Sequence, residues 1–275
     1  MTSINSNLGA MVALQNLRSV NDRMENIQEQ IGTGKKINSA KDNAAVWSMA
    51  TKVNSENSML GAIGEGLAMS SATVSMARQG AESIGELLTQ VKDKVVQAQS
   101  QTADRTQLKT EITELFKQIT SVMESASFNG KNLLEGTAEF KTVSSISRSS
   151  DTTPATTVKT IDVTAQDLKT KLDVAKINFT DDTKTAETLG EIDTMMEATT
   201  KAASALGTAE NRLETQSNFL TKLIDIKEAA VSSLVDADMT ALSAEMTQTQ
   251  TQQQLAVQAL SIAGRAPQTL LSLFR

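Results

Sequence analysis

A stripe of apolar and small residues recurs at alternating steps of three and four across residues 60–98. This heptad spacing predicts a helix that packs along a long seam. At 1.5 Å per residue the stripe is roughly 58 Å long, whereas an average helix has only about 11–12 residues. The chain is therefore predicted to be mainly α, with long antiparallel coiled-coil helical hairpins formed by its N- and C-terminal halves.

Two further stripes follow. One spans residues 108–126, and the other runs from residue 206 to residue 223 and resumes at residues 230 and 234 after a break at Lys227. The first ends at Phe128-Asn129-Gly130, where Asn-Gly marks a turn. Such stripes are structural in most proteins, so we interpret all three as core. The predicted seam residues are Leu60, Ile63, Leu67, Val74, Ile84, Leu88, Val91, Val95, Ile112, Leu115, Ile119, Val122, Leu206, Leu213, Leu220 and Leu223.

The character of the chain changes between residues 139 and 185. Residues 142–160 include 11 Ser or Thr in 19 positions, and the runs 161–164 and 176–179 alternate like short strands. We predict a small, exposed, partly β outer insertion at the tip of a helical hairpin. We favour a plain solvated loop for the tract; the alternative is O-glycosylation at Ser144, Ser145, Ser147, Ser149, Ser150, Thr152 and Thr153.

The two ends of the chain carry apolar stripes of their own, and no acidic residue occurs from residue 246 to the end. Because free termini usually fray, each stripe is expected to pack against the other end or against another copy of the chain. The residues predicted to pack in this way are Leu8, Met11, Leu14, Leu17, Met24, Ile27, Ile31, Leu255, Leu260, Ile262, Leu270, Leu271, Leu273 and Phe274.

Composition argues against several functional classes. The chain has no Cys, His or Tyr and a net charge of −6, which disfavours catalysis, metal and cofactor binding and nucleic-acid binding. The glycines at 61, 64 and 66 lie inside a heptad stripe, which is a poor context for a phosphate loop. The pairs Asp181–Asp182 and Asp236–Asp238 are interpreted as caps or surface charge rather than a Ca²⁺ site. We expect no catalytic residue, no cofactor, no membrane insertion and no cleaved signal peptide.

Four segments together resemble bacterial flagellin: INSNLGAMVALQNL near the start, IGTGKKINSAKDNAA at 31–45, FNGKNLL at 128–134 and LAVQALSIAGRAPQTLLSLFR at the end. The resemblance covers residues 3–135 and 187–275, and the short middle is similar to the compact flagellins of alphaproteobacteria. One departure is Gly264-Arg265, where the family commonly has Asn-Gln.

The resemblance implies a secreted subunit of the extracellular flagellar filament, exported unfolded by the flagellar type III system. It implies inner filament-core helices at 1–43 with 236–275, a helical bundle shell at 44–138 with 186–235, and an outer insertion at 139–185. Expected partners are further copies of the chain, a flagellar export chaperone, and hook-associated and filament cap proteins. The segment 37–45 would connect core to shell, with contacts between subunits from Lys35, Lys36, Ser39, Lys41 and Asp42. Ser39 or Asp42 is expected to cap the next helix.

Two alternatives remain open at this point. A hook-filament junction protein shares such terminal helices but resembles flagellin less at LSLFR. An intracellular coiled-coil scaffold would explain the heptads but not the acid-free C-terminal segment.

Overall fold

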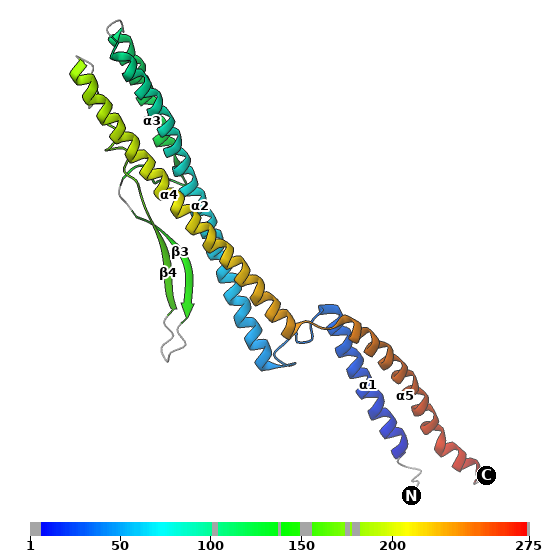
Figure 1. The fold of residues 1–275 in the computed structure, drawn as a ribbon. Helices are drawn as coiled ribbons and strands as arrows, with labels where there is room; N and C mark the ends of the chain where they lie inside the picture. Colours follow the sequence, from blue (N-terminus) through cyan, green and yellow to red (C-terminus); the bar gives the residue numbers. More distant parts are fainter. Residues whose placement is uncertain are drawn as a thin grey trace. The chain divides into compact units, whose positions relative to one another are not determined.

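The computed structural model describes residues 7–100, 104–136, 139–148, 156–173, 177 and 182–273. In the described residues the helices are α1 (Leu8–Thr33), α2 (Ala44–Ala98), α3 (Arg105–Ser125), α4 (Asp182–Val235) and α5 (Met239–Leu273). The strands are β1 (Ser127–Phe128), β2 (Lys131–Asn132), β3 (Glu139–Arg148) and β4 (Thr156–Thr164). The predicted class, long packed helices with a small β insertion, is confirmed (Figure 1). None of the described helices is long and apolar enough to cross a membrane.

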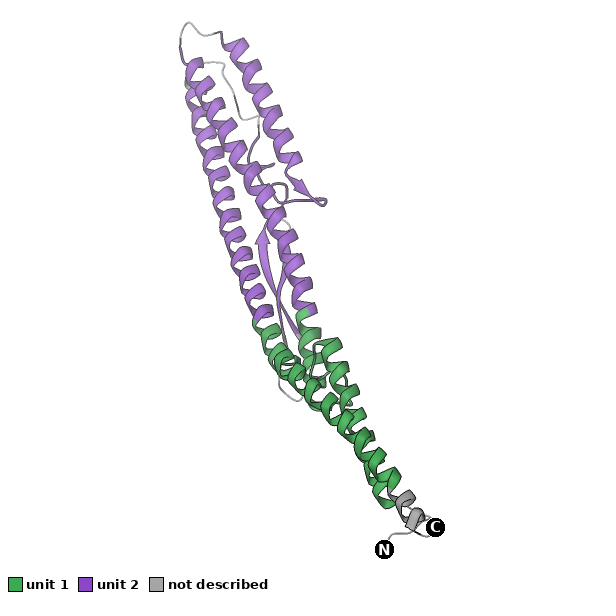
Figure 2. Cartoon of the chain, turned by 90° about the vertical axis from the view of Figure 1, so that its right-hand side faces the viewer, with its two compact units in different colours: residues 1–57, 226–275 green, residues 58–225 purple. Residues whose placement is uncertain are grey.

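The chain forms two compact units, drawn in different colours in Figure 2. Unit 1 comprises residues 1–57 and 226–275, and unit 2 comprises residues 58–225. The boundaries expected from the sequence, 43/44 and 235/236, coincide with the helix junctions α1–α2 and α4–α5. The two compact units divide within α2 and α4, so each of these helices contributes to both units.

Unit 2 is built on a seam shared by α2, α3 and α4. Of the residues predicted for the seam, all are buried except Leu115, Val122 and Leu223, which are partly buried against the same cluster. The structure adds Phe116 and Met123 on α3. It also extends the α4 seam toward its N-terminus through Thr185, Thr188, Ile192, Met195 and Thr199, all buried.

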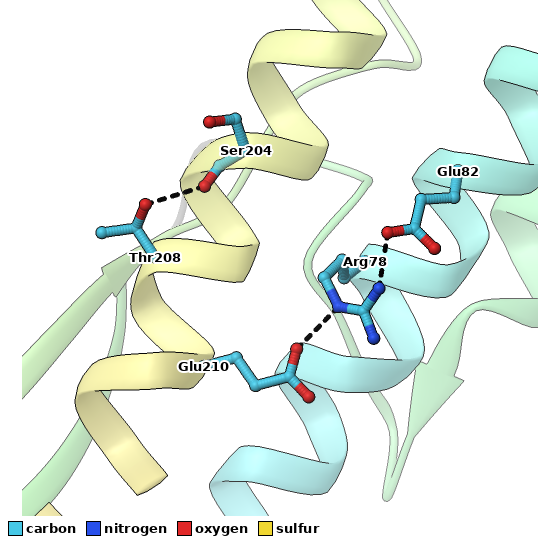
Figure 3. Close-up of polar contacts among 5 residues, drawn as sticks. All are labelled: Arg78, Glu82, Ser204, Thr208 and Glu210. Carbon is cyan, nitrogen blue, oxygen red and sulfur yellow. Dashed lines mark hydrogen bonds and ion pairs between the residues drawn. The ribbon is translucent and has the colours of Figure 1, made fainter. Parts of the chain in front are cut away.

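A polar clamp joins α2 to α4 across this seam (Figure 3). The Arg78 Nε donates to Glu210 Oε2 at 2.7 Å, and its Nη1 pairs with Glu82 on the same helix. The two carboxylates raise the pKa of Arg78, with the hydrogen bond to Glu210 as the largest cause. All three side chains are partly exposed, so the ion pairs contribute little to the free energy of unfolding. We infer that their main effect is to fix the register between α2 and α4.

The segment after α3 is a tight hairpin. Ser127 pairs with Asn132 and Phe128 with Lys131, and the two turn residues Asn129 and Gly130 have φ values of 49° and 73°. Two consecutive left-handed residues define the type I′ turn that suits a two-residue hairpin loop. The turn predicted from Asn-Gly is confirmed.

The β3–β4 hairpin corrects two predictions. It packs along the helices of unit 2 rather than at the tip of a helical hairpin: Thr142 Oγ1 donates to Ser70 Oγ of α2 at 2.5 Å, and Gln216 of α4 donates to the Ser144 carbonyl at 2.9 Å. Residues 139–148 and 156–164 are paired strands, so the Ser/Thr tract is not a plain loop. Its apolar face, Ile161 and Val163, joins the helical core.

The serines and threonines considered for O-glycosylation are divided by the fold. Ser144 is buried and its hydroxyl donates to the Lys159 carbonyl at 3.1 Å, which makes it a poor acceptor for a glycan. Ser145 is half-buried, and Ser147 lies in β3. Ser149, Ser150, Thr152 and Thr153 lie outside the described residues, as does the predicted strand at 176–179 except for the buried Ile177.

In unit 1, α4 is continuous through Lys227, where its apolar stripe was interrupted. Lys227 Nζ lies 2.7 Å from Glu56 Oε2 of α2, and about a quarter of each side chain is exposed. The interruption of the stripe therefore marks a cross-helix ion pair and not a helix end.

Candidate functional site

The two ends of the chain lie side by side in unit 1, as α1 and α5 (Figure 1). The Asn7 side chain has two partners: its Oδ1 accepts from the Ala10 amide at 3.1 Å and caps α1, while its Nδ2 donates to the Ala263 carbonyl at 2.7 Å. Further along, Gln253 Nε2 donates to Asn21 Oδ1 at 2.8 Å. The predicted pairing of the N- and C-terminal helices is present within one chain.

This pairing leaves much of the apolar stripe in solvent. Of the predicted packing residues, Met24 and Ile27 are buried and Leu17, Ile31 and Leu260 are half-buried. Five are exposed: Leu8 (69%), Met11 (66%), Leu14 (39%), Leu255 (58%) and Ile262 (73%). The side chains of Leu270, Leu271 and Leu273, and the whole of Phe274, lie outside the described part. Several large exposed apolar side chains on one helix pair indicate an interaction site.

Between the two helices runs a groove of about 530 Å³, lined by residues that include Val12, Ala13, Leu255 and Ala259. Charge is scarce on one of its walls, because α5 carries only two charged residues, Glu245 and Arg265. A surface with few charges can be buried against a partner without a large desolvation cost. The paired terminal helices therefore have the composition of an interface that is still uncovered in the single chain.

The connector, residues 34–43, begins where α1 ends. Gly34 has φ of 70° and its amide donates to the Gln30 carbonyl at 2.8 Å, which is the left-handed C-cap that favours glycine. The amides of Lys36 and Ile37 then donate to the Val235 carbonyl, and the Ala237 amide donates to Gly34. The connector is thus paired with the junction between α4 and α5. Sequence reasoning missed this pairing, because no local pattern links segments 200 residues apart.

The connector also contains a tight turn around Asp42. Its carboxylate accepts from the Ser39 amide at 2.9 Å, from the Asn38 amide at 3.0 Å and from the Ser39 hydroxyl. These bonds, that from the Ser39 amide first, lower the pKa of Asp42. The prediction that Ser39 or Asp42 caps α2 is wrong: Asn43 Oδ1 accepts from the amides of Ala45 and Val46. The Asp42 carboxylate is already used within the turn.

Around this turn lies a polar depression of about 660 Å³, lined by residues that include Glu29, Lys36, Lys41 and Asp42. Lys35, Lys36, Lys41 and Asp42 are exposed, and Ser39 is half-buried. Of the predicted contact residues of the connector, Lys36, Ser39, Lys41 and Asp42 therefore lie around one depression, whereas Lys35 does not line it.

The enzyme-like features considered in the sequence have structural roles. The glycines at 61, 64 and 66 lie within α2, so they form no phosphate loop. Asp238 accepts from the amides of Thr240 and Ala241 and caps α5, as predicted. Across the described residues there is no group of three or more Asp, Glu, His or Cys side chains suited to hold a metal ion.

Comparison with known proteins gives consistent matches along the chain. Residues 4–139 match the bacterial flagellin N-terminal helical region, and residues 189–274 match the bacterial flagellin C-terminal helical region. Flagellin FljM of Caulobacter vibrioides is 36% identical over 278 residues, covering 100% of this chain and 99% of that protein. A flagellin of Brucella melitensis is 37% identical over 282 residues, covering 100% of both.

Among solved structures, one described as a flagellar hook-associated protein from Vibrio parahaemolyticus aligns with a TM-score of 0.54. It is 17% identical and covers 71% of this chain and 100% of that one. At this identity the likeness shows a shared fold alone.

Proposed function

The chain belongs to the bacterial flagellin family and is a structural, non-enzymatic subunit of the extracellular flagellar filament; from this premise we propose that its paired helices α1 and α5 form the innermost contacts of that filament. The observation that carries the proposal is the exposed apolar surface of the pair, above all Leu8, Met11, Leu255 and Ile262. Neighbouring copies of the same helices would cover it.

The long seam of unit 2 has a different role in this proposal. Its residues are already buried within one chain, so the α2, α3 and α4 bundle forms a shell that folds before assembly. Small residues such as Ala77, Ala81 and Ala98 let the helices approach closely, and the seam gains its stability from length. The shell would keep its shape while the terminal helices acquire new partners.

The connector residues Lys35, Lys36, Ser39, Lys41 and Asp42 would make polar contacts between neighbouring subunits. All of them except Lys35 line one depression, and the turn around Asp42 is held by hydrogen bonds within the chain. Residues whose backbone is fixed in this way lose little entropy when a partner binds.

The remaining expected partners follow from the same surface. Before assembly, the exposed side chains of α5 would promote aggregation, so we infer that an export chaperone covers this helix until the chain leaves by the flagellar type III system. At the two ends of the filament, the α1–α5 surface would contact hook-associated and cap proteins through the same apolar residues.

The alternative considered from the sequence, a hook-filament junction protein, is compatible with the fold shared with the Vibrio structure, but that likeness does not favour it. Full-length coverage of the Caulobacter and Brucella flagellins at 36–37% identity favours the filament subunit instead.

Negative-stain electron microscopy of the purified chain after seeding tests the proposal. The comparison is a variant that lacks residues 1–43 and 240–275. Filaments from the full chain alone would support contacts through the terminal helices. Filaments from both would refute the inner-core role of α1 and α5, and filaments from neither would favour the junction protein.

A further inference from the structure

A small apolar groove lies between α2 and α3 in unit 2. Its volume is about 260 Å³, and it is lined by Met76, Gln79, Gly80, Ser83, Ser121, Val122, Ser125 and Ala126. Small-molecule sites usually have at least about 300 Å³ and several convergent polar groups. This groove is smaller and carries no charged side chain, so it suits one apolar side chain of a partner better than a free ligand.

Two exposed carboxylates follow or precede lining residues of the groove. Glu86 follows Ser83 by three residues, which places it on the same helix face, and Glu124 directly precedes Ser125; both are exposed. On α3 the Lys or Arg closest in sequence to the lining residues is Lys117, whose Nζ pairs with Glu114 at 2.7 Å. A complementary partner would bring one apolar side chain flanked by positive charge.

Such a side chain is present on α4 of the same unit. Phe219 is 55% exposed, the most exposed aromatic residue in the described part of the chain. Spacings of seven and three place Arg212 and Lys222 on its helix face, and both are exposed. Aromatic residues, Phe among them, and Arg are both enriched at protein–protein interfaces.

We propose that Phe219 of one subunit inserts into the α2–α3 groove of a neighbouring copy, with Arg212 and Lys222 facing Glu86 and Glu124. The occupant is a second copy because the chain is a filament subunit, and the inference rests on that function. Phe219 does not occupy the groove of its own chain, since no α4 residue lines it and Phe219 itself is exposed. Because the subunits of a helical filament are related head to tail, we expect this contact to be heterologous, with the Phe219 of each subunit entering the groove of the next.

The first test measures the critical concentration for polymerisation of full-length variants. Phe219→Ser is expected to raise it about tenfold or more, because burying an aromatic anchor at an interface is commonly worth at least that factor. Val96→Ser is the matched control, since Val96 is another exposed apolar residue of unit 2 (51%). Far-UV circular dichroism of both monomers should be unchanged, because neither side chain is buried. Equal critical concentrations for the two variants would overturn the proposal.

A charge exchange tests the partner assignment. Arg212→Glu and Glu124→Arg should each raise the critical concentration, and the double variant should restore it toward the parent value. Additive losses in the double variant would contradict the pairing.

Cross-linking tests the contact directly, because the natural chain has no Cys. Thr215→Cys is combined in turn with Ser83→Cys, Ser121→Cys and Ser125→Cys, and filaments are oxidised. Disulfides require Cα atoms about 4.4–6.8 Å apart, so at least one pair should give linked chains in filaments but not in monomers. Absence of linked chains for all three pairs would overturn the proposal. The variant that lacks residues 1–43 and 240–275 tests the proposed function separately, because it retains both Phe219 and the α2–α3 groove.

Discussion

Replacing Gly80 with Ala tests how closely α3 approaches α2. A Cβ added at this glycine would lie 2.8 Å from Ala126 Cβ and 3.0 Å from Leu134 Cδ1. Carbon atoms pack favourably at about 3.5–4.0 Å, so the new methyl would overlap Ala126 by about 0.7 Å or more. Neither neighbour can move easily: the Ala126 amide is held by Val122 and Met123, and Leu134 is fully buried.

The expected change in the free energy of unfolding for Gly80→Ala follows from two opposing effects. Overpacking a core costs about 1–3 kcal/mol, while Ala in a helix interior is favoured over Gly by about 0.8–1.0 kcal/mol. Gly64→Ala isolates the second effect, because Gly64 lies in the same helix and a Cβ there would meet nothing within 4 Å. The free energy of unfolding should therefore be about 1–3 kcal/mol lower for Gly80→Ala than for Gly64→Ala.

Urea unfolding of the monomeric variants, followed by far-UV circular dichroism, measures this difference. Monomers are used so that filament contacts make no contribution. The expected order of stability is Gly64→Ala, then the parent chain, then Gly80→Ala. If Gly80→Ala proves as stable as Gly64→Ala, the close approach of α3 to α2 is refuted.

Three further predictions concern other parts of the chain. Leu14→Asp or Leu260→Asp should abolish filaments in electron micrographs while the helical dichroism of the shell persists; normal filaments would contradict the inner-helix proposal. The lowered pKa of Asp42, caused first by the Ser39 amide, means that the stabilisation of the turn is complete above the ordinary pKa of Asp and is lost as pH falls through the lowered value. Titration of this carboxyl by NMR should show the depression, and an ordinary or raised pKa would count against the turn. Gly130→Ala should lower the free energy of unfolding by about 1–2 kcal/mol in thermal or urea unfolding because the φ of Gly130 is 73°, and an unchanged midpoint would refute the strain.

The helical architecture was predictable because its signal is periodic and local. Thirteen of the sixteen seam residues assigned from the heptads of α2, α3 and α4 are buried, and Asn129-Gly130 identified a turn. The sequence did not predict the part of the α4 seam in which buried positions are occupied by polar residues. Thr185, Thr188 and Thr199 are buried on α4, but threonines in a stripe are indistinguishable in sequence from a solvated face. The same ambiguity concealed β3, whose Thr142 hydroxyl donates to Ser70, and the first part of β4. The strand predicted at residues 161–164 is confirmed as the end of β4.

The candidate site was predictable as a set of residues but not as a set of contacts. The apolar stripe of α1 could be read from its spacing, whereas its exposure could not, because exposure depends on how far α5 covers it. The cap of α2 was wrong by one residue: Asp42 and Asn43 are both good caps, and only the turn that occupies Asp42 selects Asn43. The pairing of the connector with Val235 is non-local and has no signature in either segment.

The hydrogen bonds that join the two ends of the chain give unit 1 a particular order of formation. Asn7 and Ala263 are 256 residues apart, so α1 has no partner until almost the whole chain has become available. Local contacts can form early, but contacts at such separation form late, after the entropy of closing the loop has been lost. A chain that ends prematurely, before residue 239, lacks α5 entirely and cannot close unit 1. Because unit 1 closes only when α5 is present, a truncated chain lacks the paired terminal helices that the proposed filament contacts require.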